Sequence, residues 1–102
     1  MSASVKIVMV EDDLGHAKLI EKNIRRANIA NEIAHFADGG TALDYLFSDE
    51  VRHNGPLLIL LDLNLPDMSG TDILARVKND ERLRRAPVVV LTTTDDKLEI
   101  DR

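Results

Sequence analysis

The run of five apolar residues at positions 57–61 constrains the fold of this chain more than any other stretch. These residues lie between Gly55-Pro56 and Asp62, and no polar residue interrupts them. Five residues are too few for a buried helix, whereas an unbroken apolar run of this length is typical of a parallel strand covered on both faces. We therefore expect Asp62 at the carboxyl end of a central strand, the end that borders the ligand-binding crevice in open α/β sheets.

Predicted strands and helices alternate on both sides of this central strand. In chain order they are a strand at 5–10, a helix at 14–28, a strand at 32–36, a helix at 38–47, the central strand, a helix at 71–79, a strand at 88–91 and the start of a helix at 95–102. Such alternation predicts parallel strands, right-handed crossovers and helices on both faces of the sheet. The expected fold is one doubly wound α/β domain over residues 1–102.

The composition excludes several classes of partner and of chemistry. With 18 acidic and 13 basic residues the net charge is −5, which argues against nucleic acid or an anionic membrane because phosphates attract clustered Lys and Arg. There is no cysteine, so disulfides, thiol catalysis and thiolate metal sites are excluded. No apolar run approaches the ~20 residues that cross a bilayer, and we expect a soluble, cytoplasmic protein.

Functional side chains follow three of the predicted strands. Glu11 and Asp12 come after the first strand, Asp62 after the third and Thr92 after the fourth. Parallel strands bring these ends to one edge of the sheet, where three carboxylates repel one another unless a cation is present. Oxygen ligands without cysteine favour a hard ion such as Mg²⁺. A carboxylate beside Mg²⁺ can also attack phosphorus, because the metal neutralises charge on the transferring phosphoryl group.

These residues resemble the receiver domain of two-component response regulators. Glu11 and Asp12 are similar to the family's acidic pocket, positions 62–70 follow its D-x-x-x-P-x-x-x-G pattern, and Thr92 ends the fourth strand at the expected separation from Asp62. The likeness covers nearly the whole chain and is greatest to single-domain regulators that serve phytochrome-type kinases. It implies a flavodoxin-like or CheY-like sheet with the strand order 2-1-3-4.

The resemblance also implies a role for each residue of the site. Asp62 would accept a phosphoryl group from a phosphohistidine of a sensor histidine kinase. Thr92 would hydrogen-bond that group and move inward to pass the change to the surface. Asp12 and Asp62 would bind Mg²⁺ directly and Glu11 through water, and the backbone carbonyl of Asn64 would complete the set. The chain would then be a phosphoacceptor that signals by protein contacts, and not an enzyme with turnover.

The sequence departs from the family pattern at its end. Receivers continue through a fourth helix, a fifth strand and a fifth helix, and the fifth strand ends in a lysine that pairs with the phosphoryl group. This chain stops at Arg102, and Lys97 comes too early to replace that lysine. The fourth strand would then be an exposed edge that invites pairing with another chain, so we expect a homodimer or larger assembly. The missing lysine keeps open a second function, a non-phosphorylated dimerisation or docking module.

A phosphatase of the haloacid-dehalogenase type is a further alternative. Such enzymes also place an aspartate nucleophile after a strand, but they need a second aspartate two residues later as general acid. Asn64 stands at that position, which disfavours a hydrolase. The three histidines, His16, His35 and His53, lie far apart without ligand spacing, and we interpret them as surface or satisfied side chains.

Overall fold

The computed structural model describes residues 5–52 and 55–91. Strands and helices alternate along them in the order β1 (Lys6–Val10), α1 (Leu14–Arg26), β2 (Ile33–Phe36), α2 (Gly39–Leu46), α3 (Asp49–Arg52), β3 (Leu57–Asp62), α4 (Gly70–Lys78), the 3₁₀ helix η1 (Leu83–Arg85) and β4 (Val88–Leu91). The short α3 and η1 lie between the segments for which the sequence predicts strands and helices. Thr92 and the helix expected at 95–102 lie outside the described residues.

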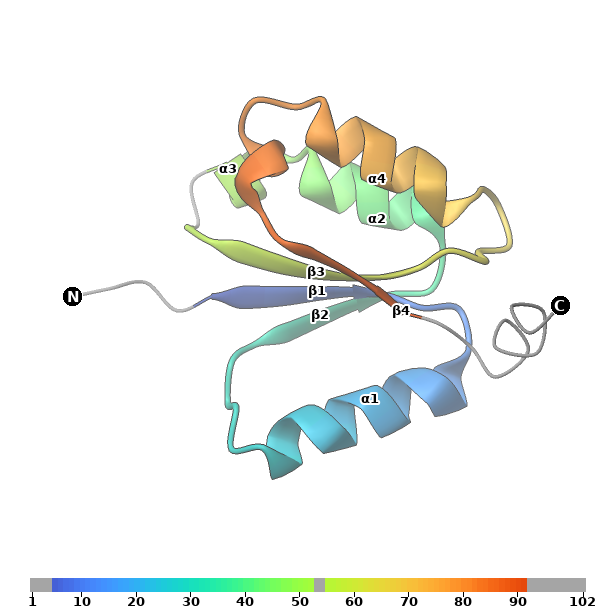
Figure 1. Ribbon diagram of the computed structural model, residues 1–102, viewed down its shortest axis with the longest axis vertical. Coiled ribbons are helices and arrows are strands. Elements are labelled where there is room, and N and C mark those ends of the chain that lie inside the picture. Colours follow the sequence, from blue (N-terminus) through green and yellow to red (C-terminus); the bar gives the residue numbers. More distant parts are fainter. Residues whose placement is uncertain (1–4, 53–54, 92–102) are drawn as a thin grey trace, which may run out of the picture.

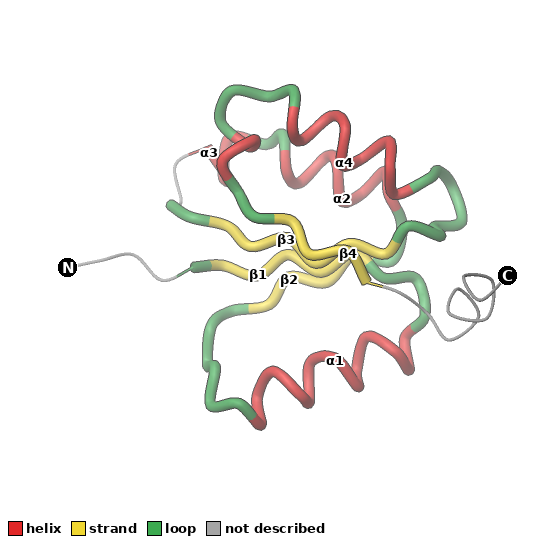
Figure 2. The backbone as a smooth tube through the Cα atoms, viewed as in Figure 1, coloured by secondary structure: helices red, strands yellow, loops and turns green. Residues whose placement is uncertain are grey.

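The four strands form one parallel sheet in the order β2-β1-β3-β4. Helix α1 lies on one side of this sheet, while α2, α3 and α4 lie on the other (Figure 1). Figure 2 shows the same arrangement as two helical layers with the strands between them. The predicted doubly wound fold and the strand order 2-1-3-4 are therefore confirmed.

The sheet is buried on both faces at its centre. Because successive side chains of a strand point to opposite faces, Val8 and Val10 of β1 pack into the core cluster under α2 and α4, whereas Ile7 and Met9 pack with Ala17 of α1. The apolar residues of β3 divide in the same way between the two clusters. This double burial explains why positions 57–61 carry no polar residue.

Side-chain caps fix where the helices begin. Asp13, Asp38 and Ser69 precede α1, α2 and α4, and each accepts a backbone N–H of the first turn, from His16, Thr41 and Thr71 respectively. Such caps satisfy N–H groups that have no partner inside the helix. Helix α1 ends two residues earlier than expected, shortly before Asn28, whose φ of 65° is left-handed and not helical.

Among the described residues, no helix is both long enough and apolar enough to span a bilayer.

Candidate functional site

Three carboxylates meet at the carboxyl edge of the sheet. Glu11 and Asp12 directly follow β1, and Asp62 is the last residue of the neighbouring strand β3. The two strands pair with Val10 opposite Leu61, so Glu11 and Asp62 take equivalent places one residue further on. One carboxylate oxygen from each of the three residues lies within 4.8 Å of the other two. The parallel pairing thus brings together acids that are far apart in the sequence.

Two of these acids are almost completely buried. The exposed fractions are 1% for Glu11 and 2% for Asp62, whereas Asp12 is exposed to solvent. Burial raises the pKa of Glu11 above its usual range, and the negative charge of Asp62 acts in the same direction. The backbone N–H of Asp13 and the nearby His16 oppose this rise in pKa. Buried acids in such proximity are unfavourable unless a proton or a cation lies beside them.

The chemistry of the donors fits a divalent cation. All the candidate ligand atoms are carboxylate oxygens, the ligand type that Mg²⁺ prefers in proteins. Because Asp12 is exposed, the cluster is also open to water. A cation at this position would favour the ionised form of buried Glu11 and so oppose the effect of burial on its pKa. The arrangement is therefore suited to hold a hard cation next to the carboxylate of Asp62.

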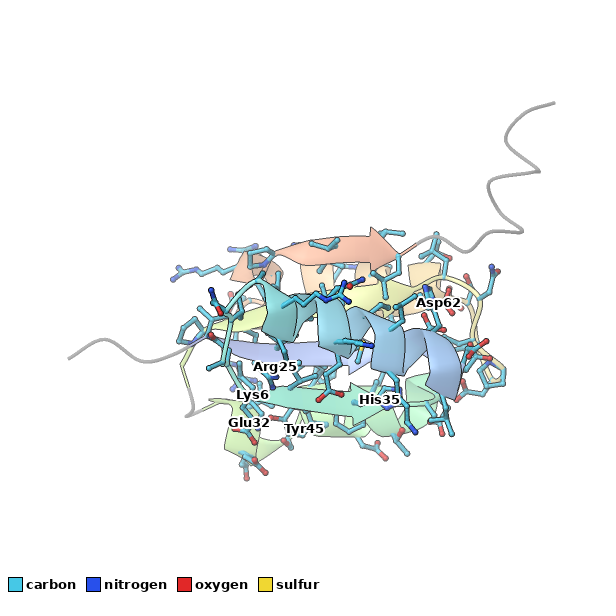
Figure 3. All side chains as sticks on the ribbon, turned by 90° about the horizontal axis from the view of Figure 1, so that it is seen from below. Lys6, Arg25, Glu32, His35, Tyr45 and Asp62 are labelled. Atoms are coloured by element: carbon cyan, nitrogen blue, oxygen red, sulfur yellow. The ribbon has the colours of Figure 1, made fainter. Side chains whose placement is uncertain are left out.

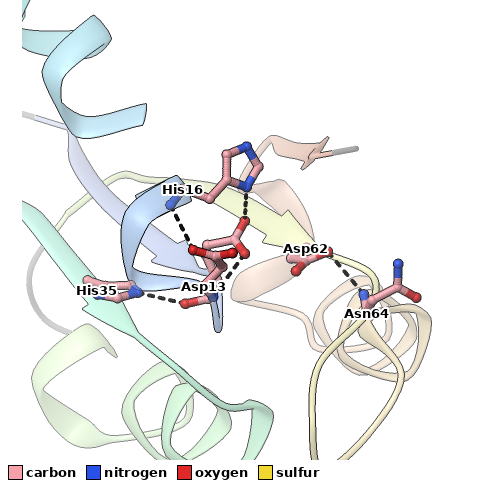
Figure 4. Close-up of polar contacts among 6 residues, drawn as sticks. Asp13, His16, His35, Asp62 and Asn64 are labelled. Atoms are coloured by element: carbon pink, nitrogen blue, oxygen red, sulfur yellow. Dashed lines mark hydrogen bonds and ion pairs between the residues drawn. The ribbon is translucent and has the colours of Figure 1, made fainter. Parts of the chain in front are cut away.

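The loop after β3 is held close to Asp62. Asp62 Oδ1 accepts a hydrogen bond from the backbone N–H of Asn64 at 3.0 Å (Figure 4). The loop closes where the N–H of Gly70 donates to the carbonyl of Leu63 at 2.9 Å. A side chain at Gly70 would place its Cβ 2.6 Å from Leu63 Cα and closer still to the carbonyl oxygen of Asp62. Only glycine fits here without moving the main chain of the site.

Two histidines make hydrogen bonds to Glu11, and no sequence pattern predicted these contacts. Nδ1 of His16 lies 2.8 Å from Glu11 Oε1, and Nε2 of His35 lies 2.7 Å from the backbone oxygen of Glu11 (Figure 4). From the sequence both were interpreted as surface or satisfied side chains, and both have a hydrogen-bonding partner in the same residue, the carboxylate of Glu11 for His16 and its main-chain oxygen for His35. Metal-ligand spacing could not find them, because neither contact follows a helical or strand period. His53 lies outside the described residues.

Asp67 is a third residue near the site whose contacts no sequence pattern predicted. Its Oδ1 and Oδ2 accept the backbone N–H groups of Gly39 and Gly40, each at 2.8 Å. These hydrogen bonds stabilise the charged form, and they lower the pKa of Asp67. The carboxylate thus ties the loop that carries Asn64 to the first turn of α2.

The site occupies one end of the sheet. Asp62 lies at the opposite end from Lys6 and Glu32 (Figure 3). Leu91, the last residue of β4, pairs with Asp62. Thr92 is outside the described part of the chain, and its expected role stays a prediction.

Comparison with known families gives the identity of this fold and site. The family model of the response regulator receiver domain matches residues 7–102. The chain belongs to the response regulator receiver family. A solved receiver domain from Rhodospirillum rubrum is 61% identical and superposes with a TM-score of 0.83, covering 95% of this chain and 71% of that one.

Two further relatives of this receiver are response regulators from phytochrome-associated and cyanobacterial systems. The bacteriophytochrome response regulator RtBRR is 37% identical with a TM-score of 0.79, covering 96% of this chain and 62% of that one. Rcp1 of Synechocystis is 36% identical over 92% of this chain and 65% of its own length. A solved structure of Rcp1 shows its Mn²⁺-bound form. Its superposition on this chain has a TM-score of 0.74 and 34% identity, and it covers 93% of this chain and 72% of that one. The predicted resemblance to phytochrome-associated receivers is confirmed.

The chain covers only part of its curated relatives. It spans 61% to 65% of the length of the curated relatives that it matches first.

Proposed function

We propose that this receiver accepts a phosphoryl group on Asp62 from a sensor histidine kinase, in a step that depends on Mg²⁺. The observation that carries the proposal is the buried carboxylate of Asp62 beside Glu11 and Asp12, at the edge of a receiver fold. Membership of the receiver family supports a phosphoacceptor and not an enzyme that turns over a substrate. The phosphorylated receiver would transmit its signal by contacts with other proteins.

Phosphoryl transfer to this site needs a nucleophile and a cation that neutralises negative charge. An oxygen of the Asp62 carboxylate forms the new bond to phosphorus, and the bond between phosphorus and the histidine nitrogen of the kinase breaks. The electron pair stays on that nitrogen, and the product on Asp62 is an acyl phosphate. A phosphoryl group brings further negative charge to a site that already has three carboxylates. Mg²⁺, bound by Glu11, Asp12, Asp62 and the backbone carbonyl of Asn64, would neutralise that charge.

A phytochrome-type kinase is the partner that the relatives favour. RtBRR is described as a bacteriophytochrome response regulator, and by analogy we infer the same class of kinase for this chain. Phosphotransfer from a panel of labelled kinases would test this, and preference for another class would contradict it. A cytoplasmic location remains a prediction, which cell fractionation can test.

We also propose that two copies associate through β4. Among the described strands β4 pairs only with β3, and its Val89 and Val90 are 47% and 40% exposed. Apolar side chains on an edge strand favour pairing with another chain. Light scattering after size exclusion should show a dimer or a larger assembly, and a monodisperse monomer at micromolar concentration would refute the proposal.

The intact mass of the protein after incubation with acetyl phosphate and Mg²⁺ tests the main proposal. We expect one phosphoryl adduct that is lost when Mg²⁺ is chelated and is absent in Asp62→Asn. The variant keeps the size of the side chain but removes the nucleophilic charge, so it is a matched control. If folded wild-type protein gives no adduct, the phosphoacceptor proposal fails. A dimerisation or docking module would then describe the chain better.

A further inference from the structure

We propose that His16 is a positioning residue that holds the Glu11 carboxylate in the orientation needed to bind the divalent cation. The inference rests on the proposed function, because it concerns the same metal site. The ring of His16 makes a hydrogen bond of 2.8 Å to Oε1 of Glu11, whose side chain is 1% exposed. His16 itself is 30% exposed, so it reaches the buried acid from the surface.

Each carboxylate oxygen of Glu11 has its own hydrogen-bonding partner. Oε1 is held by the ring of His16, and Oε2 accepts the backbone N–H of Asp13 at 3.2 Å. A carboxylate that binds a cation is ionised and can only accept hydrogen bonds, so in the metal-bound protein Nδ1 of His16 would donate in this contact. A side chain with three rotatable bonds is thereby fixed at both ends of its carboxylate. Removing the ring would leave one donor, and the carboxylate could then rotate about its last bond.

A closed ring of hydrogen bonds joins three residues around the start of α1, namely Glu11, Asp13 and His16. Asp13 donates its N–H to Glu11 and accepts the N–H of His16 on Oδ1 at 3.0 Å, and His16 closes the ring through its side chain (Figure 4). The capping residue Asp13 therefore positions His16, and the imidazole of His16 positions the carboxylate of Glu11. All three contacts lie within residues 11–16, so the turn can fix Glu11 before a cation binds.

His35 acts on a different part of Glu11. Its Nε2 contacts the main-chain oxygen from strand β2, so it supports the backbone and not the carboxylate. Substitution of His16 thus removes the side-chain contact and leaves the main-chain contact in place. Partners of this kind are known to matter, since loss of a group that orients a metal ligand typically weakens metal binding about 10- to 100-fold.

Calorimetric titration of the full chain with Mg²⁺ tests the role of His16. We expect His16→Leu to weaken Mg²⁺ binding about 10- to 100-fold. His16→Asn should retain nearly wild-type affinity, because its amide N–H stands the same number of bonds from the backbone as Nδ1 of histidine. Lys18→Leu, an equally apolar change at an exposed position of the same helix, is the matched control and should bind like wild type. Thermal unfolding in EDTA checks that all variants fold.

The possible outcomes separate the two proposals. Wild-type affinity in His16→Leu would refute the positioning role and leave the metal site intact. Equal weakening in His16→Leu and His16→Asn would also refute it, since the hydrogen bond would then not be what matters. If the wild-type protein itself bound no Mg²⁺, the proposed function would fail, and this inference with it.

Discussion

Replacement of Gly70 by alanine should destabilise the protein and disturb the site together. The added methyl would lie 2.6 Å from Leu63 Cα and 3.1 Å from the carbonyl carbon of Asp62. All of these neighbours are main-chain atoms of the segment that carries the phosphoacceptor, so no flexible side chain can give way. Overpacking of this kind costs about 1–3 kcal/mol, and backbone contacts place this case at the upper end of that range.

The helix propensity of alanine partly offsets the loss of stability caused by the clash. Gly70 is the first residue of α4, and alanine is favoured over glycine in helices by about 1 kcal/mol at most. The expected net loss in the free energy of unfolding is therefore about 2 kcal/mol. Because the main chain must shift at Asp62 and Leu63, we also expect weaker Mg²⁺ binding.

Urea unfolding followed by circular dichroism measures the loss of stability. Gly15→Ala is the matched control, since its added methyl would meet only the side-chain oxygen Asp13 Oδ1 at 3.3 Å, which can move. Its stability should stay within about 1 kcal/mol of wild type. If Gly70→Ala unfolded at the same urea concentration as wild type, the argument from close main-chain contact would be wrong.

Three further predictions concern charge and the sheet edge. Asp62→Asn should raise the melting temperature of the metal-free protein, because it removes a carboxylate whose negative charge acts on the buried carboxyl group of Glu11; a lower melting temperature in EDTA would contradict this. The lowered pKa of Asp67 means that its carboxylate stabilises the fold above the unfolded pKa of ~3.9 and loses this effect as the pH falls through the folded pKa. Asp67→Asn should therefore be less stable than wild type at pH ~7, with the difference shrinking below pH ~4, and a pH-independent difference in urea unfolding would refute the reasoning. Val89→Lys should convert the assembly to monomers in light scattering, because a charge on an apolar edge opposes strand pairing; unchanged mass would place the interface elsewhere.

The metal site could be predicted from the acidic residues that follow the predicted strands. Glu11, Asp12 and Asp62 follow apolar runs, and parallel strands place such ends at one edge of a sheet. The structure brings these three together within 4.8 Å, whereas Thr92 lies beyond the described residues. The pattern could not tell that Glu11 is buried while its neighbour Asp12 is exposed, since this depends on how the chain turns from β1 into α1.

The sequence by itself determined the order of the four strands and of the helices α1, α2 and α4, the central place of β3 and the set of acids at the carboxyl edge of the sheet. It could do so because strand burial and helix amphipathicity are written in local residue periods. Only the tertiary structure decided that His16 and His35 contact Glu11 and that Asp67 binds the start of α2. These contacts depend on the path of turns and on neighbours from other strands and helices, which no local period encodes.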